Sequence, residues 1–189
     1  MAPLAASRSP AAVAAVVSVS GPAVGVVPQE EYRLRRQLPA RGFTDADVRQ
    51  ALALLHEQVD RVRAGDDPTD VHAAQARWHD APWYPLLAGT SPASIRFLAG
   101  IADHDPQPAL AALRCPLLAI FGADDVQVPV DASVRALDRI LADHTVVVFP
   151  DADHGIRVRG VRAPGSDELV VTWLRRRLPA APEPDPPRA

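Results

Sequence analysis

Two short apolar segments in the C-terminal half of the chain constrain the fold more than any other feature. Leu117 to Phe121 and Thr145 to Phe149 both lack the alternation of polar and apolar residues that a half-exposed strand shows. Such segments are typical of strands covered on both faces of a parallel sheet. An amphipathic helical segment, Ala132 to Ala142, lies between them. Strand, helix and strand over about thirty residues predict a right-handed βαβ unit.

Acidic and histidine side chains follow directly after both predicted strands. Asp124 and Asp125 come after the first, and Asp153 and His154 come after the second. The carboxyl ends of adjacent parallel strands lie at one edge of a sheet, about 4.8 Å apart, so these side chains can meet. An aspartate that accepts a hydrogen bond from one imidazole nitrogen leaves the other nitrogen free as a base. The pattern therefore predicts two of the three members of a nucleophilic triad.

The two loops resemble those of a known superfamily. Gly122, Asp125, Val128 and Pro129 match the G-x-x-D-x-x-V-P stretch of α/β-hydrolases, and Asp153-His154-Gly155 resembles the loop that carries their histidine. The order of acid before histidine is also the order in this superfamily. The resemblance implies that Asp125 is the triad acid and His154 the base. Asp124 is the alternative acid, and Asp153 is expected to shape the histidine loop.

The resemblance extends to most of the chain and implies its organisation. Residues 1–27 look like the helix and strand that follow the nucleophile in these proteins, and residues 28–113 look like a helical cap inserted in the fold. Residues 114–178 form the C-terminal βαβα part, and residues 179–189 read as a disordered Pro-rich tail. The predicted fold class is thus a partial α/β-hydrolase fold. It has a mostly parallel sheet of about three strands, helices on both faces and a helical cap.

The sequence departs from the superfamily at the nucleophile. These enzymes carry a G-x-S-x-G elbow, which is absent here. The nearest stretch, Ser18 to Gly21, lacks the first glycine and follows the wrong strand, so Ser20 is predicted to be structural. The resemblance then implies an ester or acyl hydrolase whose serine would lie upstream of Met1, and a chain that is inactive alone. The alternatives are a non-catalytic binding protein, a truncated fragment, or a dehalogenase-like enzyme with an Asp or Cys nucleophile.

Aromatic residues are concentrated in the predicted helical insertion. Clustered aromatic side chains suit a substrate pocket, but they equally suit packing of a helical layer against a sheet. Packing is favoured for the group as a whole. Trp83 and Tyr84 are the candidate substrate-binding residues, with a small ester or acyl compound as the expected ligand.

Composition excludes several classes of function. A net charge of -3 without a basic patch disfavours nucleic-acid binding. No apolar run reaches the eighteen or so residues that a membrane helix needs. The one cysteine, Cys115, rules out an internal disulfide and a cysteine-rich metal site. No cofactor or metal is expected; a metal site at Asp151, Asp153 and His154 is disfavoured because the three residues are tightly clustered and lack a separate second group of ligands.

The N-terminal residues bear on location and association. Ala11 to Val19 has the apolar character of a short signal peptide, but Pro10 opens the run and its end is strand-like, so a cytoplasmic location is predicted. If the sheet ends at this strand, Val16, Val17 and Val19 would form an unpaired edge. Such an edge favours association with another chain.

Overall fold

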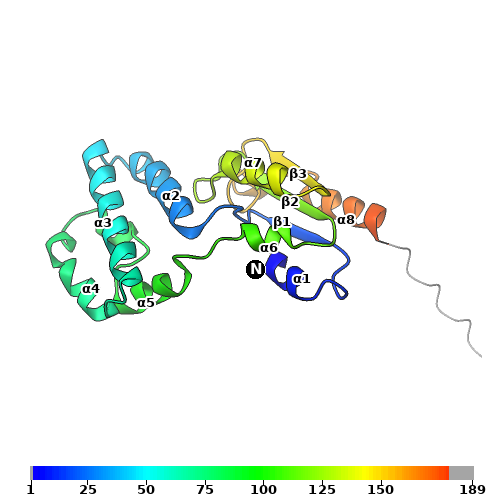
Figure 1. Ribbon diagram of the computed structural model, residues 1–189. Helices are drawn as coiled ribbons and strands as arrows, with labels where there is room; N and C mark the ends of the chain where they lie inside the picture. Colours follow the sequence, from blue (N-terminus) through cyan, green and yellow to red (C-terminus); the bar gives the residue numbers. More distant parts are fainter. Residues whose placement is uncertain (1, 179–189) are drawn as a thin grey trace, which may run out of the picture.

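The computed structural model of the protein describes residues 2–178, which form a small α/β part joined to a group of helices (Figure 1). Met1 and the predicted disordered tail, residues 179–189, lie outside the described residues. The elements in chain order are α1 (Ala2–Arg8), β1 (Val16–Val19), α2 (Val26–Ala40), α3 (Asp45–Arg63), α4 (Pro68–Ala74), η1 (Ala76–Trp78), η2 (Tyr84–Leu86), α5 (Pro92–Ile101), α6 (Gln107–Ala111), β2 (Leu117–Gly122), α7 (Val130–Ile140), β3 (His144–Phe149), β4 (Arg157–Val158), β5 (Val161–Arg162) and α8 (Ser166–Arg177).

A three-stranded parallel sheet in the order β1-β2-β3 forms the centre of the α/β part. β2 is the middle strand, and all six of its residues are buried. The predicted βαβ unit is confirmed as β2, α7 and β3. The predicted fold class, a mostly parallel sheet with helices on both faces, is also confirmed.

Helices cover the two faces of the sheet because side chains of β2 point alternately to opposite sides. Leu117, Ala119 and Phe121 face one side, where they pack in one cluster with Ala6 of α1, Leu110 of α6 and Leu137 of α7. Leu118 and Ile120 face the other side and pack with Trp173 of α8. A central strand with apolar residues at every position is therefore fully used for packing.

The two outer strands differ from the prediction. β3 was expected to be covered on both faces, but Val148 is 39% exposed. β3 pairs only with β2 among the described residues and is an edge strand, and its other residues are partly buried, so its two faces are less completely covered than predicted. β1 lies at the opposite edge and has four residues. Of its valines Val19 is exposed while Val16 is buried, so only part of the predicted apolar edge is open.

The helices α2 to α5 form a separate group, called the helical cluster below, with its own apolar interior. α3 begins with a reciprocal capping box formed by Thr44 and Asp47. The expectation of helices without strands across residues 28–113 is confirmed. The last of these helices, α6, nevertheless packs Leu110 against the sheet and not with the helical cluster.

The position of the helical cluster matters for the site. The carboxyl end of β1 leads into α2, and α3, α4 and α5 lie beyond α2 on the side away from the sheet (Figure 1). The helical cluster therefore approaches the carboxyl ends of the strands through α2. Whether the cluster functions as a cap stays a prediction.

Candidate functional site

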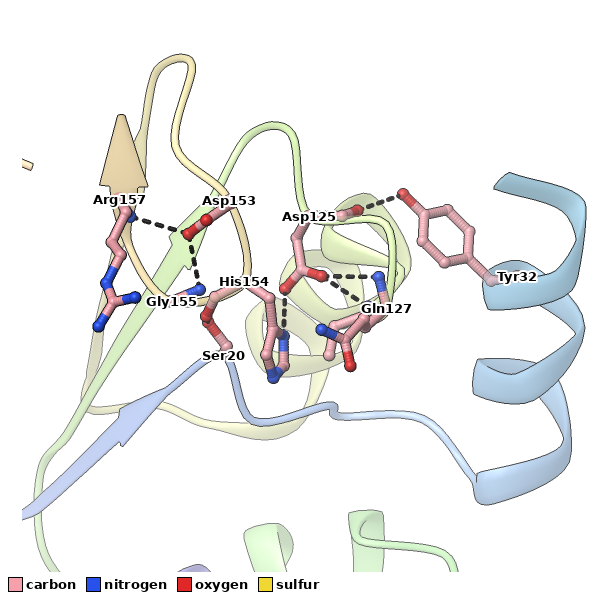
Figure 2. Close-up of polar contacts among 9 residues, drawn as sticks. Ser20, Tyr32, Asp125, Gln127, Asp153, His154, Gly155 and Arg157 are labelled. Atoms are coloured by element: carbon pink, nitrogen blue, oxygen red, sulfur yellow. Dashed lines mark hydrogen bonds and ion pairs between the residues drawn. The ribbon is translucent and has the colours of Figure 1, made fainter. Parts of the chain in front are cut away.

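Asp125 and His154 meet at the carboxyl edge of the sheet, as the sequence predicts. The Nδ1 atom of His154 lies 2.9 Å from Oδ2 of Asp125, within hydrogen-bonding distance (Figure 2). The Asp125 side chain is fully buried, whereas the His154 side chain is 41% exposed. The predicted geometry is thus confirmed, and the catalytic role of the pair stays a proposal.

The loop after β2 fixes the orientation of the Asp125 carboxylate. Oδ1 accepts hydrogen bonds from the backbone N–H of Gln127 at 2.7 Å and of Val128 at 3.0 Å. One oxygen is therefore held by the loop itself, and the other is left for the imidazole. Asp124, the alternative acid, is exposed and makes no such contact with His154. The structure accordingly favours Asp125 over Asp124 as the carboxylate that pairs with His154.

The loop after β3 is shaped by Asp153, as expected. Its Oδ1 accepts from the backbone N–H of Gly155 at 2.8 Å and of Arg157 at 3.0 Å (Figure 2). A carboxylate engaged in this way organises the turn that presents His154. Among the described residues, no three or more His, Cys, Asp or Glu side chains are grouped so that they could hold a metal ion, and Asp151, Asp153 and His154 do not form such a group.

The two loops are joined directly by backbone contacts. The N–H of Ala123 donates to the carbonyl of Phe149, and that of Asp124 donates to the carbonyl of Ala152, both at 2.9 Å. Gly122 lies at the closest approach, because a Cβ at this position would be 2.3 Å from the carbonyl oxygens of Ala152 and Asp153. The loops can lie this close only because residue 122 has no side chain.

The geometry defines what the pair can do chemically. An ionised carboxylate accepts hydrogen bonds but cannot donate them. Nδ1 of His154 must therefore carry a proton and donate the hydrogen bond to Asp125. The Nε2 atom is then the acceptor and is available as a base. The carboxylate also stabilises the imidazolium that forms after proton transfer. The pair is therefore equipped to activate a nucleophile but does not itself supply one.

Ser20 lies beside the pair but does not point at the imidazole ring. Its Oγ donates a hydrogen bond of 2.7 Å to the main-chain carbonyl of His154, and the residue is buried. A hydroxyl group engaged with a carbonyl is not placed to be deprotonated by Nε2. The structural interpretation of Ser20 is consistent with this contact.

Tyr32 of α2 contacts the other loop and was not identified from the sequence. Its hydroxyl donates a hydrogen bond of 2.9 Å to the main-chain carbonyl of Asp125 (Figure 2). The two residues are 93 positions apart, and no motif surrounds Tyr32. Only the tertiary fold reveals this contact.

Trp83 and Tyr84, the candidate substrate-binding residues, lie inside the helical cluster. Trp83 is 1% exposed and Tyr84 is 6% exposed. The Tyr84 hydroxyl donates to Gln75 at 2.8 Å, and burial raises the pKa of this phenol. Both side chains are used for packing because the helical cluster needs its own core. Their predicted contact with substrate is therefore corrected to a packing role.

An apolar cavity of about 250 Å³ lies next to the segment that follows Ser20. It is bounded by the start of α1, the connection from β1 to α2, and α6. Trp83 and Tyr84 do not line it, and neither do Asp125 and His154.

Within the described residues, no helix combines the length and apolar character required to cross a membrane.

Comparison with known proteins bears on the fold of the chain. No family model matches the chain. The non-heme chloroperoxidase CPO-A1 of Kitasatospora aureofaciens is 30% identical over 89 residues, which are 47% of this chain and 31% of that protein. The solved structure of VinJ superimposes with a TM-score of 0.50 at 18% identity, covering 94% of this chain and 62% of its own. A proline iminopeptidase from Mycobacterium smegmatis gives a TM-score of 0.50 at 19% identity, with coverages of 93% and 61%.

The superpositions with the two solved structures show that the chain has part of an α/β-hydrolase fold. The chain spans less than two thirds of each of these three proteins. The resemblance inferred from the two loops is therefore confirmed at the level of the fold. The reaction and the substrate are matters for proposal.

Proposed function

We propose that the protein provides the acid and the base of a serine hydrolase site, which acts on a carboxylic ester or a related acyl bond. The observation that carries this proposal is the hydrogen bond between Asp125 and His154 at the carboxyl ends of adjacent parallel strands. A serine from a segment upstream of residue 1 would attack the acyl carbon. His154 would take its proton and return it to the leaving group, while Asp125 would hold the tautomer.

The free edge of β1 supports the proposed upstream segment. β1 pairs with β2 on one side and has no strand partner on the other among the described residues. An upstream strand would find unused backbone donors and acceptors there. The nucleophile elbow of this superfamily follows a strand, so a strand beside β1 would deliver a serine to the edge where His154 lies.

The proposed substrate class follows from the chemistry of the Asp125–His154 pair. A base that activates a hydroxyl nucleophile suits acyl transfer. No cofactor is needed for such a reaction, and a small ester or acyl compound is the proposed substrate.

Cys115 is a free thiol, which suits the proposed cytoplasmic location.

The proposal is tested by extending the chain upstream with the codons that precede Met1. The extended protein should hydrolyse a nitrophenyl ester, because it would combine the nucleophile with the base. His154→Ala in the same protein should remove nearly all of this turnover. The measurement is release of nitrophenolate, with circular dichroism to verify that the variant is folded. Turnover that is unchanged by His154→Ala would contradict the proposal.

A further inference from the structure

Both members of the Asp125–His154 pair have their main-chain carbonyl held by a hydroxyl group from elsewhere in the chain. Ser20 donates to the carbonyl of His154 at 2.7 Å, and Tyr32 donates to the carbonyl of Asp125 at 2.9 Å. These bonds span 134 and 93 positions in the sequence. Neither hydroxyl touches the reacting side-chain atoms, so both act on the backbone that carries them.

The two donors lie at opposite ends of one segment. Ser20 directly follows β1, and Tyr32 is on α2, so residues 20–32 run from the sheet into the helical cluster (Figure 2). This segment is called the strap below. It contacts the histidine loop at its beginning and the acid loop near its end, so the strap spans the two loops.

Ser20, the first residue of the strap, has an unusual backbone conformation. Its φ of 49° lies in the left-handed region, which is unfavourable for residues with a side chain. Glycine would adopt this φ at no steric cost. A serine is present instead, and its hydroxyl makes the contact with His154 that glycine could not make. Strain at this position therefore accompanies a specific hydrogen bond.

We propose that Ser20 and Tyr32 are positioning residues for the Asp125–His154 pair. Through the strap, the placement of the helical cluster is coupled to the distance between the carboxylate and the imidazole. Tyr32 lies on α2, and the same helix packs against the rest of the helical cluster through Leu34 and Leu38. A movement of α2 would thus be transmitted to the acid loop. The benefit of this positioning for hydrolysis rests on the proposed function, whereas the geometric coupling does not.

The coupling is tested in the 189-residue chain by its effect on the shared proton. A hydrogen-bonded Nδ1 proton gives a downfield NMR signal that exchanges slowly with water, and His154→Ala assigns it. Tyr32→Phe and Ser20→Gly each remove one hydroxyl. Each should raise the exchange rate of this proton by about fivefold, the effect of losing one ordinary hydrogen bond. Ser20→Gly removes the hydroxyl without adding strain, because glycine accepts the positive φ.

Matched controls distinguish positioning from a general loss of stability. Tyr84→Phe removes the hydroxyl of the other tyrosine in the chain, which contacts Gln75 inside the helical cluster. Ser7→Ala removes a serine hydroxyl that contacts the carbonyl of Leu4 on α1. Both controls should leave the exchange rate of the His154 proton unchanged.

A double-mutant cycle provides a second readout that does not depend on the NMR signal. In urea unfolding, Tyr32→Phe and His154→Ala should be non-additive if the tyrosine acts on the pair. The proposal is overturned by an unchanged exchange rate in both hydroxyl variants, by additive effects in the cycle, or by absence of the slow Nδ1 proton in the parent chain. Failure of the extended protein to hydrolyse esters would contradict the proposed function and leave these three results unaffected.

Discussion

Asp125→Asn is expected to lower the turnover of the extended, active protein by about 10⁴-fold. The asparagine oxygen can still accept from the N–H groups of Gln127 and Val128, so the loop keeps its shape. The amide nitrogen then faces His154 and donates a hydrogen bond to Nδ1, whereas the carboxylate of Asp125 accepts one from it. Nδ1 must become the acceptor and Nε2 the protonated nitrogen, which removes the base. Nitrophenyl ester hydrolysis measures the loss.

Asp124→Asn is the matched control for this substitution. Asp124 is the neighbouring aspartate and is exposed, and its backbone N–H rather than its side chain contacts the histidine loop. The same change of carboxylate to amide at this position should alter turnover by less than about twofold, as is usual for surface substitutions. Equal losses at the two positions would show that Asp125 has no special role.

Gly122→Ala should give the largest loss of stability among single small substitutions. The new Cβ would lie 2.3 Å from two carbonyl oxygens of the histidine loop, and these are backbone atoms that cannot rotate away. Overpacking of this kind costs about 3 kcal/mol of unfolding free energy when backbone must shift. The shift would also move His154 away from Asp125. Urea unfolding measures the first effect, and the slow Nδ1 proton reports the second.

Gly100→Ala provides the control for the same chemical change. Gly100 is exposed on α5, and a Cβ there would lie more than 4 Å from every heavy atom other than those of its two chain neighbours and the nearby backbone of its own helix. Alanine is favoured over glycine within a helix, so this variant should be stabilised by about 0.5–1 kcal/mol. If Gly122→Ala were as stable as Gly100→Ala, the close approach of the two loops would not exist in solution.

The sequence predicted the parts of the site that depend on local order along the chain. β2, α7 and β3 follow from periodicity, and the ends of parallel strands necessarily share one edge. The proximity of Asp125 and His154 could therefore be predicted from the sequence alone. The capping box of α3 was predictable for the same reason, since both of its members lie within four residues.

Features that depend on the tertiary neighbourhood were missed or wrong. The pattern of β3 indicates a strand covered on both faces, but β3 lies at the edge of the sheet, where the helices cover its faces only in part. Trp83 and Tyr84 could line a pocket or fill a core, and only the packing of the helical cluster decides between these roles. Ser20 and Tyr32 act across about a hundred residues, so no local spacing marks them.

The most direct test of the central claim is ester hydrolysis by the 189-residue chain itself. The claim is that these residues hold the acid and the base but not the nucleophile. Nitrophenyl acetate should therefore be hydrolysed no faster by the folded chain than by its His154→Ala variant. Turnover that depends on His154 would contradict this account, because a residue within the chain would then be the nucleophile.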